Sequence, residues 1–296
     1  MSWKELFASL LPARLRSAGL EREDKGPVMK AIQKVLNNVL STRTISVLGP
    51  ALYGRYLARF LVMLPRIARS GDLRPLDRVM GSRARQFRYR GSRFTFDCPF
   101  CDDQVPEDTF AFGIAREIYV RDCYFKWQPP WVYEQARNVM DLGANRGALS
   151  SLMTTRADRI VAVECQDKYA PVIRHNLGEN GFARYAVEIG FVGAGGMFAE
   201  KRGNRFTIRE LRSRHGMGTV DFLKIDIEGS EFPLFDETDW LTDVRAVSME
   251  VHSSYGDPSP VLGALVRAGF STVIADEDLR RIHDAGRANY IYAWKP

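Results

Sequence analysis

The stretch 139-VMDLGANRG-147 places an acid just before a turn that contains two glycines. Gly143 and Gly147 suit a tight loop that brings backbone N–H groups close to a ligand, as in phosphate-binding loops. Asp141 would repel a phosphate, however, and the spacing D-x-G-x-N-x-G differs from the dinucleotide pattern G-x-G-x-x-G. The loop therefore favours a ligand with positive charge and no phosphate at this point.

A second acid, Glu164, ends the apolar segment 159–164, 23 residues after Asp141. A carboxylate there can accept hydrogen bonds from both hydroxyls of a ribose. S-adenosylmethionine has a ribose, a positive charge and no phosphate, so we expect it as the cofactor. Its amino group would pair with Asp141, and its carboxylate would lie near the N–H groups of the helix opened by Asn145 to Gly147. The predicted cofactor-binding residues are Asp141, Gly143, Ala144, Asn145, Gly147, Glu164, Cys165 and Asp226.

Polar residues also end two later apolar segments, 220–226 and 244–251. An acid such as Asp226 at the end of a central strand is costly to bury unless it is used. His252 has an intrinsic pKa that suits a base near neutral pH. For Lys224, an ion pair with a neighbouring acid is an equally open interpretation. The predicted catalytic residues are Asp226, Glu228, Glu250 and His252.

The same groups could hold a divalent cation, because adjacent strands of a sheet lie only ~5 Å apart. The candidate metal ligands are Asp226, Glu250 and His252. Magnesium suits the two carboxylates but accepts an imidazole less readily. Two versions stay open: a magnesium site with His252 as base, and a site without an ion in which the acids orient His252 and the acceptor.

From about residue 137 onward, apolar strand segments alternate with helical segments. The helical candidates are 146–156, 168–180 and 258–268, and the strand candidates are 138–142, 159–164, 185–189, 220–226, 244–251, 271–275 and 289–294. This alternation predicts a Rossmann-like α/β fold, in which a mostly parallel seven-stranded sheet carries helices on both faces. Ligands would bind at the carboxyl ends of the strands.

The first hundred residues differ from the rest in charge. They carry 19 Lys+Arg and 7 Asp+Glu, or +12, whereas the remainder carries 23 and 29, or −6, giving the overall +6. Helical spacing follows Pro27, and a second helix is predicted from about 51 to 64, ending near Pro65. If that helix continued, four arginines would share an arc of roughly 80°. They are Arg55, Arg59, Arg66 and Arg69.

Aromatic residues and arginines alternate over 86–96, which predicts a hairpin. The expected domains are a basic helical extension (1–85), a hairpin and connecting segment (86–136) and the cofactor-binding domain (137–296). Cys98 and Cys101 lack a second pair and read as loop thiols rather than a zinc site. No uncharged run approaches the ~18 apolar residues of a membrane span. We expect a cytoplasmic protein, with peripheral contact to an anionic membrane through Arg55 and Arg59 and self-association as further options.

Several segments resemble the FkbM-type methyltransferases, a branch of the class I S-adenosylmethionine-dependent enzymes. They are VMDLGANRGALSSL, IVAVECQDKYAPVIRHNLGENG, TIRELRSRHGMGTVDFLKIDIEGSE and MEVH, and the resemblance covers about 110 to 296. The most specific run is K-I-D-I-E-G-S-E at 224–231. The family usually has a proline soon after the second-strand acid, where this chain has Cys165 and Gln166.

The resemblance implies an O-methyltransferase that acts on a hydroxyl of a sugar, a glycolipid or polysaccharide, or a natural product. The alternative is a non-catalytic or peripheral membrane module on a methyltransferase scaffold, which would be free to lose its site residues. The chain instead keeps Asp141, Glu164, Asp226, Glu250 and His252 together. It lacks the N/D-P-P-Y/F run of many amino-directed nucleic-acid enzymes, so we expect a small-molecule or glycan acceptor and no nucleic acid.

Overall fold

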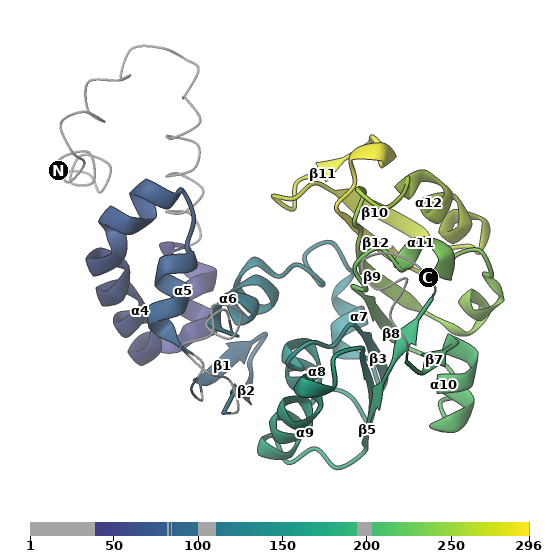
Figure 1. Ribbon diagram of the computed structural model, residues 1–296, viewed down its shortest axis with the longest axis horizontal. Helices are drawn as coiled ribbons and strands as arrows, with labels where there is room; N and C mark the ends of the chain where they lie inside the picture. The colour runs from purple at the N-terminus through teal and green to yellow at the C-terminus, as the bar shows by residue number, and fades with distance from the viewer. Residues whose placement is uncertain (1–38, 82, 84, 100–110, 194–202, 296) are drawn as a thin grey trace.

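A computed structural model describes residues 39–81, 83, 85–99, 111–193 and 203–295 (Figure 1). Its central sheet has eight strands, which are β3 (Asn138–Leu142), β4 (Arg159–Glu164), β5 (Tyr185–Ile189), β8 (Phe222–Ile225), β9 (Ala246–Glu250), β10 (Ser271–Ala275), β11 (Arg281–Ile282) and β12 (Tyr290–Trp294). The strand order is β11-β10-β12-β9-β8-β3-β4-β5. The five strands from β9 to β5 are parallel, whereas β12 runs antiparallel to both β9 and β10.

The predicted mostly parallel sheet is confirmed, and the short β11 adds an eighth strand at its edge. Four of the seven predicted strands, 138–142, 159–164, 185–189 and 271–275, have the expected bounds. These strands are strongly apolar because helices cover both faces of the sheet. The order also brings the ends of β3, β4 and β8 together, although β8 lies far from the other two in sequence.

Side chains of the sheet alternate between two hydrophobic clusters. On β3, Val139 belongs to one cluster, and Met140 and Leu142 belong to the other. The first face is covered by α8 (Ala148–Met153) and α9 (Ala170–Glu179), and the second by α10 (Ile208–Arg214) and α12 (Pro258–Arg267). The smaller elements are η3 (Asp167–Tyr169), β6 (Phe191–Val192), β7 (Arg205–Phe206), α11 (Glu231–Leu234), η5 (Asp239–Asp243) and η6 (Ala285–Arg287).

Local sequence signals set the ends of these helices. Thr207 and Glu210 form a capping box at the start of α10, in which each side chain binds the other residue's backbone N–H. Asp257 caps α12, and Pro258 occupies its first turn, where a missing N–H costs nothing.

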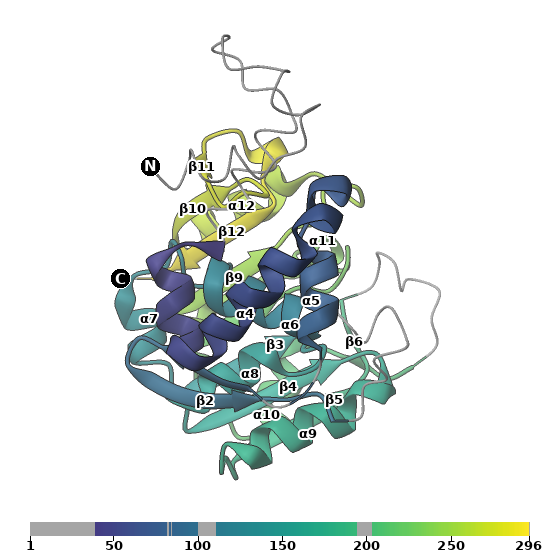
Figure 2. The same ribbon diagram turned by 90° about the vertical axis from the view of Figure 1, so that its left-hand side faces the viewer.

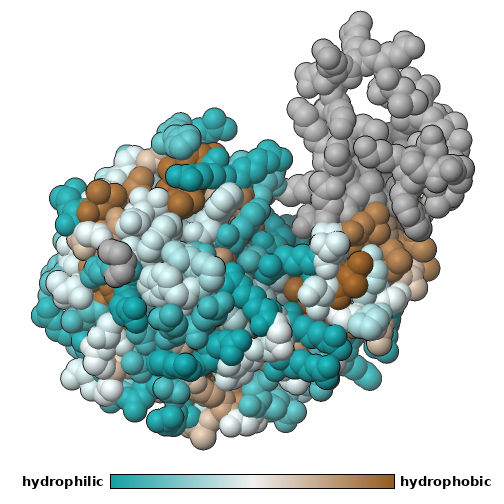
Figure 3. Space-filling view, turned by 180° about the vertical axis from the view of Figure 1, so that it is seen from behind, coloured by the Kyte–Doolittle hydropathy of each residue, from teal (hydrophilic) through white to brown (hydrophobic). Residues whose placement is uncertain are grey.

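The N-terminal elements pack beside the sheet (Figures 1 and 2). They are α4 (Thr42–Ser70), α5 (Arg74–Met80), the hairpin β1 (Arg85–Tyr89) and β2 (Ser92–Phe96), α6 (Ala111–Ala115), the π-helix η2 (Arg116–Arg121) and α7 (Pro130–Glu134). Arg116 of η2 forms a buried ion pair with Asp77 of α5 at 2.8 Å. One hydrophobic cluster runs from Val39 to Tyr292, so these elements and the sheet share a core. Figure 3 shows hydrophobic side chains also gathered on the outer surface of the helical unit.

The prediction that the second helix ends near Pro65 is wrong, because α4 continues to Ser70 and is capped by Gly71 in a left-handed conformation. Pro65 is exposed, so water can solvate the carbonyl oxygen that loses its helical hydrogen bond. The helix instead kinks at Gly49, which has a φ of 67°. The helix expected after Pro27 and the thiol of Cys101 lie outside the described residues.

Candidate active site

The loop after β3 packs tightly against the end of β8. Gly143 has a φ of 74°, and a Cβ atom there would lie 1.7 Å from the backbone oxygen of Asp226. At Gly147, with a φ of 75°, a Cβ would lie 3.3 Å from the Cα of Ile173. Both positions have a left-handed backbone that favours glycine, and at Gly143 close packing also excludes any side chain. Gly143 places the loop backbone directly beside Asp226, and Gly147 lets the loop pack against Ile173.

Glu164 is buried at the end of β4, and its carboxylate binds two backbone N–H groups. Oε2 accepts from Asn145 at 2.7 Å, and Oε1 accepts from Gln166 at 2.8 Å. The carboxylate thereby holds the loop after β3 to the turn after β4. Glu164 lines a cavity of about 160 Å³, here called the first cavity. Its other predicted lining residues are Gly143, Asn145, Cys165, Asp226 and Glu228, and its apolar lining includes Phe191, Val192 and Ile227.

A second cavity of about 220 Å³ adjoins the first. Both cavities are lined by Gly143, Asn145, Asp226 and Glu228. The second cavity also contains Asp141, Ala144, Glu250 and His252, together with Ile114, Glu117 and Ile118 from α6 and η2. The structure therefore brings together all of the predicted site residues except Gly147, which lines neither cavity and positions the loop. The N-terminal elements supply one wall, which the sequence interpretation did not include.

Lys224 is buried, lines the second cavity and compensates two acids. Its Nζ lies 3.4 Å from Asp141 and 3.5 Å from Asp226, and it donates to the backbone oxygens of Leu142 and Gly143. Burial by itself lowers the pKa of Lys224, but the charges of Asp226 and Asp141 outweigh this effect and raise it. The interpretation of Lys224 as a buried ion-pair partner is confirmed.

Asp141 is fully buried and is already engaged within the protein. Its Oδ2 accepts a hydrogen bond from the Ser150 hydroxyl at 2.7 Å, and its Oδ1 faces Lys224. An amino group of the cofactor would share this carboxylate with Lys224. The direct pairing between Asp141 and S-adenosylmethionine therefore stays a prediction.

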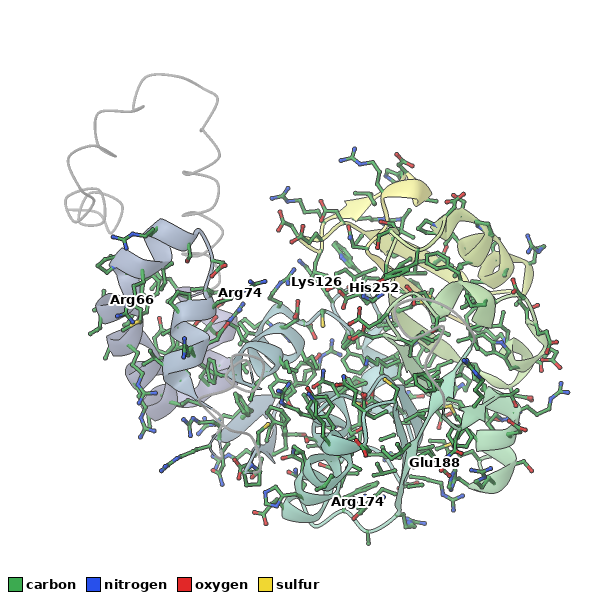
Figure 4. The ribbon with its side chains drawn as sticks, viewed as in Figure 1. Arg66, Arg74, Lys126, Arg174, Glu188 and His252 are labelled. Atoms are coloured by element: carbon green, nitrogen blue, oxygen red, sulfur yellow. The ribbon has the colours of Figure 1, made fainter. Side chains whose placement is uncertain are left out.

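His252 lies just after β9 (Figure 4). Three acids surround it. Its Nδ1 is 3.0 Å from Oε1 of Glu231, and its Nε2 is 3.3 Å from Glu228 and 3.9 Å from Asp226. Burial by itself lowers the pKa of His252, but the hydrogen bond and charge of Glu231, with the charges of Asp226 and Glu228, raise it to about 9. The resting imidazole is therefore protonated at neutral pH, contrary to the expectation that its intrinsic pKa would apply.

Glu231 holds His252 in place and was missed by the sequence interpretation. It is fully buried, and its Oε1 also accepts the backbone N–H of His252 at 2.7 Å, while its Oε2 accepts that of Gly229. Glu228 has a φ of 54°, a left-handed conformation that is unusual for this residue type and common at functional sites. Glu231 is the last acid of the run K-I-D-I-E-G-S-E, and its place in that run was the sequence signal that could have identified it as a site residue.

The candidate metal-ligand atoms that lie closest together differ from the predicted set of Asp226, Glu250 and His252. Among the described residues, Asp226, Glu228 and His252 offer atoms within 4.8 Å of one another, and Glu250 is not a member of this group. Burial, together with the charges of Asp226 and Glu117, raises the pKa of Glu250 to about 8. A carboxyl that holds its proton at neutral pH is a poor ligand for a cation.

Tyr124 contacts the site directly, because its hydroxyl donates to Oδ2 of Asp226 at 3.0 Å. By contrast, Tyr119 donates to the backbone oxygen of Ala148, and Trp127 donates to that of Leu279.

Burial and the charge of Glu164 raise the pKa of the Cys165 thiol to about 12, so it stays protonated and unreactive.

The fold is that of the class I S-adenosylmethionine-dependent methyltransferases. Without β11, the seven remaining strands taken in chain order lie in the order 3-2-1-4-5-7-6, with the seventh antiparallel. The FkbM methyltransferase domain model matches residues 199–272, which are 74 of the 296 residues, so the predicted resemblance to FkbM-type methyltransferases is confirmed.

Solved structures with a similar fold include methyltransferases with different substrates. A precorrin-6y methyltransferase from Geobacter metallireducens shares 15% identity and a TM-score of 0.37, over 60% of this chain and 87% of that one. An rRNA methylase from Streptococcus thermophilus shares 6% identity and a TM-score of 0.38, over 56% and 91%. Similarities this distant carry no information about the acceptor. A comparison with curated protein sequences found no match.

Proposed function

We propose that the chain transfers a methyl group from S-adenosylmethionine to a hydroxyl of a sugar, a glycolipid or polysaccharide, or a natural product. The observation that carries this proposal is that two cavities meet at Asp226 and Glu228, with His252 beside both acids. A methyl donor in the first cavity and a hydroxyl acceptor in the second would face each other at this junction. His252, which can accept the hydroxyl proton once its ring has lost its own, lies at the same point.

The residues of the first cavity fit the cofactor. Glu164 presents a carboxylate that suits a ribose diol, and Phe191, Val192 and Ile227 offer apolar surface for the adenine ring of the cofactor. Asp226 places negative charge where the cavities meet, and the hydroxyl of Tyr124 orients it. When bound, S-adenosylmethionine supplies a methyl carbon on a positively charged sulfur, which an acceptor oxygen can attack.

His252 is the residue that we propose takes the hydroxyl proton. Glu231 binds Nδ1, which leaves Nε2 directed at Asp226 and Glu228 in the second cavity. Because the pKa of His252 is raised to about 9, the imidazolium must lose a proton before it can act as a base. A cation bound beside Asp226 would lower that pKa, so cofactor binding and activation of the base would be linked.

The site residues fit magnesium poorly. The clustered donors are two carboxylates and an imidazole, whereas magnesium prefers oxygen ligands. A protonated His252 between Glu228 and Asp226 would also repel the ion. We therefore favour the version of the site without a metal, in which acids orient His252 and the acceptor. The acids beside His252 are Asp226 and Glu228, and not Asp226 and Glu250 as expected.

The test uses methyl-labelled S-adenosylmethionine with separate glycolipid, polysaccharide and RNA fractions, followed by mass spectrometry of the products. We expect a methyl ether on a sugar hydroxyl. His252→Ala should lower the rate on the order of 100-fold or more, since a general base contributes about 10² to 10⁴. The exposed His283→Ala is the matched control and should leave the rate unchanged.

Label on RNA, or on nitrogen or carbon, would contradict the proposed hydroxyl acceptor. Failure of the folded chain to bind S-adenosylmethionine would favour the alternative of a non-catalytic module. We also propose that the protein is cytoplasmic and that it can self-associate.

A further inference from the structure

The outer face of α4 has no protein partner among the described residues and combines apolar and basic groups. Leu61 is 51% exposed and Val62 is 71% exposed, so two adjacent large apolar side chains face outward from this helix. Arg55, Arg66 and Arg69 are exposed on the same helix, and its 29 residues include no Asp or Glu. At 100° per residue, Val62 lies between Arg55 and Arg69, so the charges flank the apolar centre.

The inner face of the same helix is fixed to the protein. Tyr56, Phe60 and Ile67 are buried in the core shared with the sheet. Arg59 points to the neighbouring α5, where its Nη1 donates to the backbone oxygen of Val79 at 2.6 Å. Arg59 is therefore removed from the predicted contact surface. Arg55 stays in it, joined by Arg66 and Arg69.

Next to α4, four arginines line a hollow of about 320 Å³, which also includes Ala51. They are Arg55, Arg85, Arg88 and Arg93, and none of the described residues that line the hollow is an acid. Burial and the like charges of Arg55 and Arg59 lower the pKa of Arg85. A bound anion would relieve this repulsion, so the hollow suits a phosphate group.

We propose that the outer face of α4 docks on the surface of an anionic phospholipid membrane, with Leu61 and Val62 among the acyl chains and the arginines at the headgroup phosphates. Arg55 belongs to both the face and the hollow, so one surface carries both contacts. Absence of acids from the helix makes this surface complementary to anionic lipid.

α4 lies on the membrane in this arrangement and does not cross it. Within the described part of the chain, Thr42–Ile67 is the one helix long and apolar enough to span a bilayer, but only by length and composition. Crossing would strip Tyr56 and Phe60 from the core and place Arg55 and Arg59 in hydrocarbon. An amphipathic helix with one protein-facing side suits the interface instead.

The test is cosedimentation of the full chain with phosphatidylcholine vesicles that contain phosphatidylserine at roughly a third of the lipid. The charge variant replaces Arg55, Arg66 and Arg69 with Gln. The control variant replaces Arg174, Arg267 and Arg287, three exposed arginines of the cofactor-binding region, with Gln as well. The net charge of each variant therefore falls from +6 to +3. Figure 4 shows that Arg66 and Arg174 lie on different parts of the molecule.

The charge variant should bind roughly 100-fold more weakly, because each arginine near an anionic surface contributes a factor of about five. The control should bind like the parent. Val62→Gln should weaken binding roughly tenfold, whereas Val266→Gln, an equivalent change at a valine that is 54% exposed on α12, should not. Binding of the parent should fall when salt is raised from about 0.1 to 1 M, which shortens the Debye length from ~10 to ~3 Å.

Equal losses in the two arginine variants would reduce the effect to net charge and overturn the proposal. Equal binding to vesicles with and without phosphatidylserine would also overturn it. Sedimentation equilibrium without lipid tests whether a second copy of the chain covers this face instead of a membrane. A dimer that Val62→Gln dissociates, with vesicle binding unchanged, would assign the face to a second copy of the chain. Circular dichroism of each variant separates lost binding from lost folding.

Discussion

Replacing Glu231 with Gln tests whether this buried acid sets the protonation of His252. The carboxylate accepts from both the Nδ1 and the backbone N–H of His252, at 3.0 and 2.7 Å. A hydrogen bond to a charged group contributes about 1.5–3 kcal/mol. One pKa unit corresponds to about 1.36 kcal/mol, so Glu231→Gln should lower the pKa of His252 by roughly one to two units. The expected value lies between the present value of about 9 and the ordinary 6.5.

The assay is an NMR titration of the histidine ring signals in Glu231→Gln and the parent chain. The chain has only four histidines, and His252→Ala assigns the relevant signal. His215, which pairs with Glu188 at 2.8 Å in another part of the fold, serves as an internal control whose signals should overlay in both proteins. An unchanged titration of His252 in a folded variant would refute the assignment of Glu231.

The same change has a consequence for stability and for rate. Because folding raises the pKa of His252, its imidazolium stabilises the fold fully below about pH 6.5, and this contribution is lost as pH rises to about 9. If His252 is the base, turnover rises with pH as the ring loses its proton. In Glu231→Gln, both changes should shift to lower pH, which chemical denaturation and initial rates at a series of pH values would measure.

Three other predictions concern the cofactor, the buried cation and the metal. Glu164→Ala should weaken S-adenosylmethionine binding by about 1.5–3 kcal/mol in calorimetry, because it removes a charge-assisted contact; unchanged affinity would reject the assigned ribose contact. Lys224→Met should destabilise the fold by about 3–5 kcal/mol in urea, because it leaves the carboxylate of Asp141 buried without its cationic partner, and adding Asp141→Asn should recover part of the loss. Turnover should persist after exhaustive chelation, and a loss that magnesium or manganese restores would show that a metal is required.

Much of the sheet could be predicted from the sequence because buried parallel strands are short apolar runs between turn residues. The bounds of β3, β4, β5 and β10 follow from this pattern alone. The two glycines of the loop were also readable, since tight backbone packing excludes a side chain at Gly143. Local signals were weaker at Pro65, where exposure to water allowed α4 to continue.

The site residues at strand ends were predictable for the same reason, because a polar group that ends a buried run marks an edge of the sheet. Asp226, Glu250 and His252 all line the second cavity. Their distances and charges were not predictable. Those depend on which strands are neighbours and on how the chain turns after each strand.

The sequence by itself determined the strand and helix pattern, the acids at the ends of β4, β8 and β9 and the basic character of the N-terminal part. Only the tertiary structure decided that Glu231 binds His252 and that the hydroxyl of Tyr124 binds Asp226. It also decided that Glu228, and not Glu250, clusters with Asp226 and His252. The contact between Tyr124 and Asp226 joins residues 102 positions apart. Secondary-structure patterns depend on near neighbours along the chain, whereas pKa values and hydrogen bonds depend on the charges and burial that packing brings together.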